Sequence, residues 1–523
     1  MRKCLLIILS LSLLVSCRER NSATTGGFES NAELLHIASK DDPESLDPRK
    51  VRDLGSVTYL HMLYEGLTRL DFQGKPIPAL AKEWEVSPDQ KTYTLRLRES
   101  RWSNGQSLTA EDFIRTWKSV LSPNFAAPNA YQFYLIKGAK AAKLGQSSLD
   151  DVGMYAPDPH TLVIELSEPA PFFPELLAAH FFYPVPSNFD PKTPVGTGPF
   201  TFNQSQPGYE WSFKKNPHYW DEHEVHLDGV VVAIVDNHTA LRLFENREID
   251  WIGSPLGSIP QEAIIPLKKR HQLQAVLGAG VHWLRVNTHD PLLKSNSLRK
   301  ALALAINRKQ LVDYVLQGNQ KKAESILPPS FSQRHNGLLV DGDIPVAWEL
   351  FQKALAEMDL SKDDLGDITL IYPTDERSHK IAQTLQQQWF KALGITIKLQ
   401  RLESQLFLEK VRSRSYQLAT GSWYADFRDP INFLEIFKNK AVSTNMTNWE
   451  NQVFTELLQQ SAVERNPQKR LALLNQAEEI LMAEMPVIPL YFASFNYVKD
   501  VTLLGVLFSD LGYLDFKYAF FSD

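Results

Sequence analysis

Residues 80–113 read LAKEWEVSPDQKTYTLRLRESRWSNGQSLTAEDF, and this stretch decides the fold class. Residues 92–97 (TYTLRL) alternate apolar and polar side chains, which is typical of a half-buried β-strand. Thr109 is placed to cap a helix that starts at Ala110, because Glu111 and Asp112 bring negative charge to its positive end. A strand followed closely by a capped helix favours an α/β protein.

The same alternation of strands and helices extends along the chain on both sides of this stretch. We expect strands at residues 34–38, 161–166, 230–235, 281–288, 416–423 and 487–492, and helices at 56–67, 298–316 and 467–482. Residues 368–399 read as a strand, a helix at 378–393 that Gly394 stops, and a second strand, which together make a βαβ unit. The pattern predicts at least two α/β lobes, and a cleft between lobes is the natural place for a ligand.

Length and composition narrow the class of protein. A chain of 523 residues is too long for one ordinary domain, so two or three lobes are expected. The net charge of −6 and the lack of any basic stripe argue against a nucleic-acid partner. Cys4 and Cys17 are the only cysteines, so the body of the chain contains no disulfide and no cysteine-based metal site.

The first residues have the pattern of an export signal. Arg2 and Lys3 precede an apolar run at 5–15, which is shorter than the roughly 20 residues that span a bilayer. We therefore predict a signal peptide at 1–16. The Leu14-Val15-Ser16-Cys17 sequence resembles the lipobox of bacterial lipoproteins, which implies lipidation of Cys17. An ordinary signal peptide with an incidental cysteine is the alternative. The polar residues 17–32 fit a flexible tether on the periplasmic or cell-surface face of a bacterial membrane.

Residues 80–113 also closely resemble the signature segment of the peptide-binding family of ABC-importer solute-binding proteins, the oligopeptide-binding or family 5 group. Further segments match landmarks of that family: Ser45-Leu46-Asp47-Pro48, Leu63-Tyr64-Glu65-Gly66-Leu67, Gly196-Thr197-Gly198-Pro199-Phe200, Asn216-Pro217-His218-Tyr219-Trp220 and Leu298-Arg299-Lys300-Ala301-Leu302. The resemblance covers nearly the whole chain after the tether.

The resemblance implies a periplasmic-binding-protein-like fold (cluster C, type II), with two lobes and an extra inserted domain. It places a discontinuous lobe I at 28–59, 186–277 and 497–523, the inserted domain II at 60–185, and lobe III at 278–496. The lobes would hinge about crossovers near 277–281 and 495–500 and close around a short peptide. Its partners would be the permease and ATPase subunits of an importer, and we expect a monomer.

The segment Ser422-Trp423-Tyr424-Ala425-Asp426-Phe427 is the predicted ligand site. In oligopeptide-binding members the Asp of this motif accepts the peptide α-ammonium, which implies that role for Asp426. A buried carboxylate needs such a partner, since burial alone is costly. The backbone at 422–425 would pair with the peptide as an added strand, and the turn at Asp42-Pro43-Glu44 would supply the facing edge. The structural alternatives are that Asp426 caps a helix, a role that Asp429 fills better, and that Trp423 and Tyr424 are core.

The end that would read the peptide carboxylate departs from the family. Thr420 and Val411 stand where the best-known oligopeptide binders carry arginines. Arg412, Arg414, His379 and Arg377 are candidates to substitute, and each is alternatively a solvated surface charge. The sequence therefore does not determine the length of the ligand, and a specialised ligand such as a dipeptide or a cell-wall peptide is an alternative to a general oligopeptide.

Other functions find less support. His223-Glu224-Val225-His226 falls one residue short of the HExxH spacing, so it reads as a polar loop, and a metal- or haem-binding member of the family is one alternative. No phosphate loop, G-x-S-x-G elbow or nucleophile motif is present, which disfavours an anchored hydrolase. A surface adhesin or chaperone that uses the same fold is the remaining rival. We expect no cofactor, no metal and no catalysis.

Overall fold

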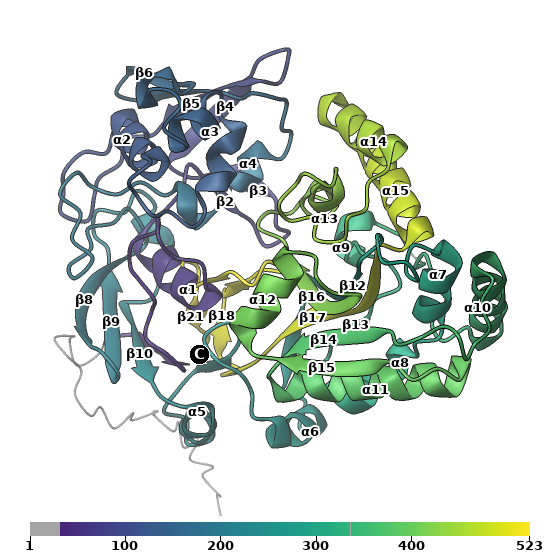
Figure 1. Cartoon of the computed structure of the whole chain (residues 1–523). Coiled ribbons are helices and arrows are strands. Elements are labelled where there is room, and N and C mark those ends of the chain that lie inside the picture. The colour runs from purple at the N-terminus through teal and green to yellow at the C-terminus, as the bar shows by residue number, and fades with distance from the viewer. Residues whose placement is uncertain (1–31, 335) are drawn as a thin grey trace, which may run out of the picture.

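The computed structural model describes residues 32–334 and 336–523, and its largest sheet is a mixed sheet of 11 strands (Figure 1). Its strands, in spatial order, are β15 (Lys398–Leu402), β14 (Thr369–Pro373), β16 (Leu418–Tyr424), β12 (Gln274–Val286), β17 (Val487–Lys499), β11 (Trp251–Gly253), β1 (Leu34–Ser39), β10 (Gly229–Ile234), β9 (Glu210–Lys215) and β8 (Phe200–Gln206). The short β13 (Lys321–Lys322) pairs with β17 off this path.

Strands β12 and β17 hold the two ends of this sheet together. Each has 13 residues, and they pair from Gln274↔Tyr497 to Arg285↔Val487 with a shift of register between Leu277 and Val281. The two strands therefore continue from one half of the molecule into the other, and an irregularity sits between the halves. The expected strand at 487–492 lies inside β17, and the one at 281–288 overlaps β12 but runs two residues past its end at Val286; both observed strands are much longer than predicted.

A second sheet belongs to the part of the chain between β1 and β8. It has the order β4 (Ala81–Val86), β5 (Thr92–Leu97), β7 (Thr161–Glu165) and β6 (Met154–Asp158), beside the hairpin of β2 (Thr68–Leu70) and β3 (Pro76–Pro78). Its helices are α2 (Ala110–Leu121), α3 (Ala139–Lys143), α4 (Phe173–Leu176) and the 3₁₀ helix η1 (Ala130–Leu135). Thr109 caps α2 in a capping box with Asp112, as the sequence predicted.

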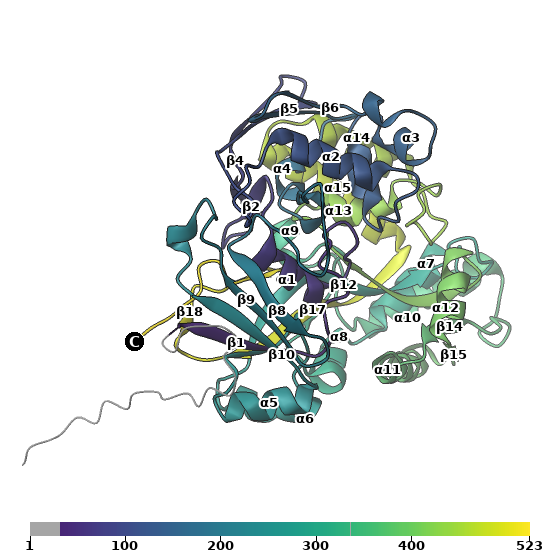
Figure 2. The ribbon, with the colours of Figure 1, turned by 90° about the vertical axis from the view of Figure 1, so that its left-hand side faces the viewer.

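The remaining helices divide between the two ends of the large sheet, and some of them, such as α14 on α15, pack on other helices. On the side of β1 they are α1 (Leu54–Leu63), α5 (Asn237–Glu245) and α6 (Gln261–Lys269), and Figure 2 shows α5 and α6 together. On the other side they are α7 (Asn296–Leu304), α8 (Arg308–Gln310), α9 (Pro329–Ser332), α10 (Ile344–Met358), α11 (Glu376–Leu393), α12 (Ser404–Arg412), α13 (Ile431–Leu434), α14 (Gln452–Val463) and α15 (Pro467–Glu484). Near the C-terminus, β18 (Leu503–Leu504) pairs β21 (Phe520–Phe521), and β19 (Leu507–Phe508) pairs β20 (Leu514–Asp515). Among the described residues no helix is both long and apolar enough to cross a membrane.

The predicted helix at 298–316 is wrong as a single element. The chain leaves α7 after Leu304, and the Asn307 side chain accepts a hydrogen bond from the Gln310 backbone at 2.7 Å, which starts a new turn. The buried Arg308 guanidinium then donates to the carbonyls of Ala303 and Ile306. Apolar spacing continued through the break because Leu311 and Leu316 remain buried, so periodicity alone did not reveal it.

The predicted helix at 56–67 also ends early, because the residues after α1 meet a distant segment. Gly198 donates its backbone N–H to the Leu63 carbonyl at 2.9 Å, and Glu65 donates its own to the Thr197 hydroxyl at 3.0 Å. A Cβ on Gly196 would lie 1.8 Å from the Leu63 carbonyl oxygen, so only glycine allows this approach. Two segments that carried the family resemblance thus pack against each other.

Candidate functional site

Strand β16 has an open edge over most of its length. On one side it pairs with β12 from Val286↔Leu418 to Gly280↔Tyr424, but on the other side β14 pairs only with Leu418 and Ala419. In the part of the chain that the structure describes, no strand covers the other edge of residues 420–424. Ala425 donates its N–H to the Ala279 carbonyl at 2.8 Å, so by the two-residue alternation Ser422 and Tyr424 direct their backbone groups away from β12. This edge can therefore accept an added strand.

Asp426 follows this strand, and its carboxylate is held by neutral donors. The Gln132 amide donates to its Oδ2 at 2.8 Å and the Tyr131 hydroxyl at 3.2 Å, both from η1. Burial raises the pKa of Asp426 above its usual value, although these hydrogen bonds and nearby Arg52 act in the opposite direction. In the described residues no Lys, Arg or His forms an ion pair with this carboxylate. The group can therefore accept a cation.

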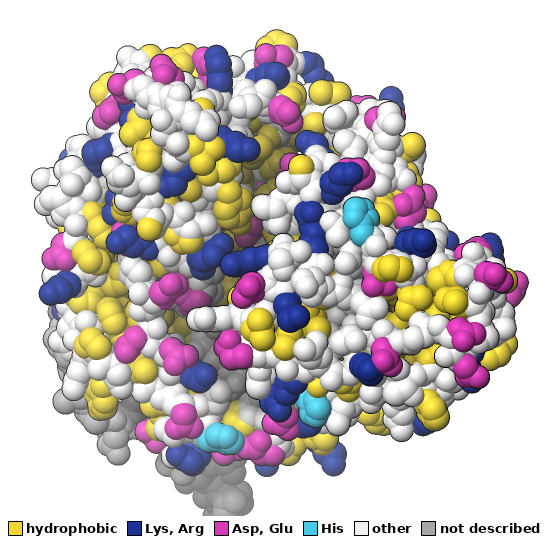
Figure 3. Space-filling view, in the orientation of Figure 1, with side chains coloured by type: hydrophobic (Ala, Val, Ile, Leu, Met, Phe, Trp, Pro, Cys, Tyr) yellow, Lys and Arg dark blue, Asp and Glu magenta, His cyan; other side chains and the backbone are white. Residues whose placement is uncertain are grey.

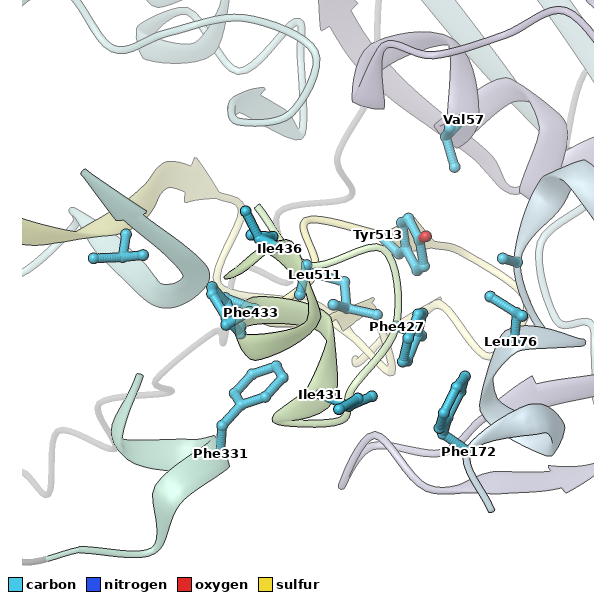
Figure 4. Close-up of a cluster of buried hydrophobic side chains, with 14 of the residues drawn as sticks. Val57, Phe172, Leu176, Phe331, Phe427, Ile431, Phe433, Ile436, Leu511 and Tyr513 are labelled. Carbon is cyan, nitrogen blue, oxygen red and sulfur yellow. The ribbon is translucent and has the colours of Figure 1, made fainter. Parts of the chain in front are cut away.

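The residues after Asp426 bind distant parts of the chain. The Phe427 ring stacks on Phe172 with centroids 4.5 Å apart, and Figure 4 shows both rings in a cluster with Ile431, Leu511 and Tyr513. The Tyr513 hydroxyl also donates to the Asp426 carbonyl at 3.3 Å. The loop therefore joins the part containing α4 to the C-terminal segment.

Arg428 extends these links through its guanidinium. Its Nη1 donates to the Gln73 carbonyl in the β2–β3 turn, and its Nε lies 3.4 Å from the Asp510 carboxylate. Burial raises the pKa of Asp510, and Arg428 counteracts that effect. Sequence reasoning did not assign this role, because neither partner is near Arg428 along the chain.

Asp429 starts the short helix α13, as the sequence predicted. Its Oδ1 accepts the Ile431 backbone N–H at 2.9 Å, and its carboxylate forms a two-pronged ion pair with Arg470 of α15 at 2.5 and 2.9 Å. Asp429 therefore binds the start of α13, just before its N-cap residue Pro430.

The other predicted residues of the motif lie along the strand. The Trp423 indole donates to Asn432 at 2.8 Å, Ser422 is half-buried and Ala425 is buried. Tyr424 is 42% exposed, and its hydroxyl lies 3.0 Å from Nε2 of His282, whose ring stacks on Tyr491. Burial lowers the pKa of His282 to about 4, so the ring is neutral at pH 7.

The turn at Asp42-Pro43-Glu44 has its own partners. The Asp42 carboxylate accepts hydrogen bonds from the Gly208 backbone at 2.8 Å and the Trp211 indole at 2.7 Å, and Glu44 donates its backbone N–H to Ser56 at 2.7 Å. Within residues 32–334 and 336–523 no hydrogen bond joins this turn to β16. That it faces the ligand stays a prediction.

The residues predicted to bind the peptide carboxylate differ in their exposure and in their partners. His379 lies 2.8 Å from the Tyr372 hydroxyl, and Arg377 is exposed at the start of α11. Arg414 instead donates to the carbonyls of Lys440 and Asn445, so it stabilises a loop, while Arg412 is exposed on α12. At Thr420 the backbone carbonyl accepts a hydrogen bond from Arg285 at 2.9 Å.

Sequence reasoning missed Tyr131, Gln132, Tyr513 and Arg285. No local pattern indicates them, because they reach the site from separate segments. The predicted lipidation of Cys17 lies outside the described residues. His223 contacts Asp221 and Glu224, while His226 packs against Phe520, and the described residues contain no group of three metal-ligating side chains.

The surface in Figure 3 is hollowed between residues 60–185 and α14–α15, and hydrophobic side chains line the hollow. Comparison of the chain with known protein families identifies its family. The model for bacterial extracellular solute-binding proteins, family 5, matches residues 75–445. The chain belongs to this family. The expected family and two-lobed α/β fold are confirmed.

Several relatives match over nearly their whole length. The oligopeptide-binding protein OppA of Bacillus subtilis is 39% identical over 95% of this chain and 96% of its own. The dipeptide-binding protein DppE of the same organism is 32% identical over 97% and 96%. Among solved structures, the unliganded open form of the murein tripeptide-binding protein MppA is 26% identical, covers 94% of this chain and 98% of its own, and has a TM-score of 0.80. These likenesses span both ends of the large sheet.

Proposed function

We propose that this protein is the substrate-binding component of an ABC-type importer and captures short peptides by their backbone and free α-amine. The observation that carries the proposal is the uncovered edge of β16, which leads directly to the cation-free carboxylate of Asp426. The names of its relatives, which bind oligopeptides, dipeptides and a murein tripeptide, support the same class of ligand.

The chemistry of Asp426 favours an ammonium ligand. A carboxylate that is buried among neutral donors stays ionised at a cost, and an opposite charge at hydrogen-bond distance offsets that cost. A peptide α-ammonium has three N–H donors, which suits the oxygens that Tyr131 and Gln132 leave available. Selection of a free amine follows from this arrangement.

The open edge explains how one site accepts many peptides. A peptide that adds to β16 pairs with main-chain groups, which every peptide shares, and its side chains alternate to the two faces of the sheet. One face presents Tyr424 and His282, and the other presents Trp423 and Trp283.

We further propose that the chain divides as the family resemblance implies, with lobe I at 28–59, 186–277 and 497–523, domain II at 60–185 and lobe III at 278–496. The passage of β12 and β17 between the two ends of the sheet supports hinges near 277–281 and 495–500. Closure around the peptide would create the shape that a permease recognises. Anchoring through a lipidated Cys17, action as a monomer outside the cytoplasmic membrane, and the absence of catalysis belong to the same proposal.

Native mass spectrometry of protein purified without denaturation tests this function. We expect additional masses that match a mixed set of short peptides, and we expect Asp426→Asn to lose them. Asp150→Asn, which removes an exposed carboxylate that pairs with Lys118, serves as the matched control and should keep them. A single bound metal, haem, or a cleft that stays empty after exposure to mixed peptides would contradict the proposal.

A further inference from the structure

Arg285 reaches across β16 because residue 421 is glycine. The arginine lies on β12, two residue pairs beyond Trp283 and on the same face of the sheet, and Trp283 is opposite Gly421. A Cβ on Gly421 would lie 1.7 Å from the Arg285 Nη1 atom and 2.9 Å from the Trp283 Nε1 atom. The Arg285 and Trp283 donors therefore both point to the space that a side chain at position 421 would fill.

The indole N–H at this point has no partner. Trp283 is 2% exposed, and its Nε1 is buried without a hydrogen bond to any described residue. A buried donor that makes no hydrogen bond costs about 1–3 kcal/mol, so such an atom usually serves a ligand or a water. Its position next to a guanidinium suggests an acceptor that both groups share.

A narrow, partly open cavity of about 40 Å³ adjoins the two donors. Trp283, Arg285, Trp423, Phe437, Thr444 and Thr447 are among its lining residues. One water needs roughly 10–15 Å³ by this measure, so the cavity has room for a carboxylate group. Its lining supplies donors and apolar walls but no acidic side chain.

Arg285 has fewer partners than the other largely buried arginines: Arg299, which likewise forms no ion pair with a described carboxylate, donates to the Leu293, Lys294 and Glu484 carbonyls. Arg69 pairs with Glu65 and Asp515, Arg308 with Asp341, and Arg470 with Asp429. Arg285 makes only its bond to the Thr420 carbonyl, and no described Asp or Glu forms an ion pair with it. Burial lowers the pKa of Arg285, because it disfavours the charged form.

We propose that Arg285 and Trp283 form a carboxylate subsite above Gly421, which binds an acidic group of the peptide on the β16 edge. This inference rests on the proposed function and adds a ligand preference to it. The carboxylate comes either from an acidic side chain or from the peptide C-terminus. Gly421 precedes Asp426 by five residues, so at about 3.3 Å per residue the subsite lies at most roughly 17 Å from the amine site, which is the length of an extended pentapeptide.

The test uses matched peptides and isothermal titration calorimetry on the full protein. One series consists of amidated alanine pentapeptides in which a single position carries Glu or Gln. The second series consists of alanine tri-, tetra- and pentapeptides with a free or an amidated C-terminus. For each pair, the ratio of the two Kd values measures the contribution of the carboxylate. The first series reports a side chain, and the second reports the terminus.

We expect the wild-type protein to prefer the acid in one of the series by about tenfold to a hundredfold, as for a charge-assisted hydrogen bond in a half-buried site. Arg285→Gln and Gly421→Ala should reduce that ratio to near one, and Arg285→Lys should retain part of it. Arg242→Gln, an exposed arginine on α5, is the matched control and should keep the full ratio. Circular dichroism melts would show that the variants are folded.

Two results would overturn the proposal. One is a wild-type protein that binds acid and amide equally at every position, and the other is an Arg285→Gln protein with the same ratios as the wild type. Both leave peptide binding itself intact, so they refute only the subsite. A wild-type protein that binds none of the peptides would instead refute the proposed function and this inference with it.

Discussion

The carboxylate of Asp426 lowers the stability of the unliganded protein and is proposed to bind the ligand's ammonium group. Its pKa is raised by burial, so the ionised form destabilises the folded state until a cation arrives. We predict that Asp426→Asn melts at a higher temperature than the wild type near pH 7 without ligand, and binds free-amine peptides at least about tenfold more weakly. Differential scanning fluorimetry and calorimetry measure the two effects.

The control for this prediction is Asp150→Asn, which should change neither the melting temperature nor the affinity. An Asp426→Asn protein that is less stable than the wild type would show that the carboxylate is part of the scaffold. The ionised form binds the ligand, so affinity should also fall as the pH drops through the raised pKa of Asp426.

Glu175 on α4 predicts a pH dependence of stability. Burial raises its pKa to about 7, the nearby Asp429 adds to this shift, and its Oε2 makes no hydrogen bond to any residue that the structure describes. The folded protein thus holds this proton more tightly than the unfolded chain, so the contribution of Glu175 to stability is greatest at low pH and is lost as the pH rises from about 4.5 to 7.

Glu175→Gln should remove this dependence. We expect the variant to gain roughly 1–2 kcal/mol over the wild type at pH 8 and nothing at pH 4.5, less than the full shift because the side chain is only half-buried. Urea unfolding at both pH values measures the difference. Equal differences at the two pH values would show that the carboxyl does not titrate in this range.

At the scale of elements, the pairing of α13 with α15 depends on Asp429. Its carboxylate caps the start of α13 and forms the ion pair with Arg470, and both side chains are nearly buried. We predict that Asp429→Ala destabilises the protein by about 3 kcal/mol, because it leaves the Arg470 charge buried and unpaired. Urea unfolding measures this loss, and Asp429→Ala combined with Arg470→Met should recover much of it. A double variant no more stable than the single one would contradict this account.

Local rules determined which elements the sequence predicted well. Strand β5 and helix α2 follow from period-two alternation and from the capping box at Thr109, and both depend only on near neighbours. The break between α7 and α8 and the full lengths of β12 and β17 depend on distant partners such as the Pro489 carbonyl, which binds Arg308. A single sequence contains no local signal for such contacts, so these features could not be predicted.

At the scale of the whole molecule, Arg428 connects three parts of the chain. It contacts the β2–β3 turn and Asp510, and it lies two residues from the carboxylate proposed to bind ligand. We predict that Arg428→Gln shifts the unliganded protein toward a more open shape and weakens peptide binding several-fold. Small-angle X-ray scattering with and without peptide measures the shape, and Arg428→Lys should lie between the two.

Removing the counter-charge also leaves Asp510 buried and unpaired, so the double variant Arg428→Gln/Asp510→Asn should recover stability but not closure. Scattering curves for Arg428→Gln that match those of the wild type would show that the arginine does not link the lobes.

As with the fold, the parts of the candidate site that lie close together in the sequence were predicted, and the parts from distant segments were not. Asp426, Trp423 and Tyr424 were predicted because they occupy one continuous motif, whereas Tyr131, Gln132 and Tyr513 come from two other regions of the chain. Asp42 was expected at the ligand, but its carboxylate is bound by Gly208 and Trp211. The motif therefore predicts the charge at the site, and only the assembled molecule shows the donors that hold it.

The most direct test of the account compares the affinity of one short peptide with that of its N-acetylated form. Acetylation removes the α-ammonium and leaves the backbone that would pair with β16. We predict that the wild-type protein binds the free-amine form at least about tenfold more tightly, and that Asp426→Asn removes the difference. Equal affinities of the wild-type protein for the two forms would contradict the role proposed for Asp426.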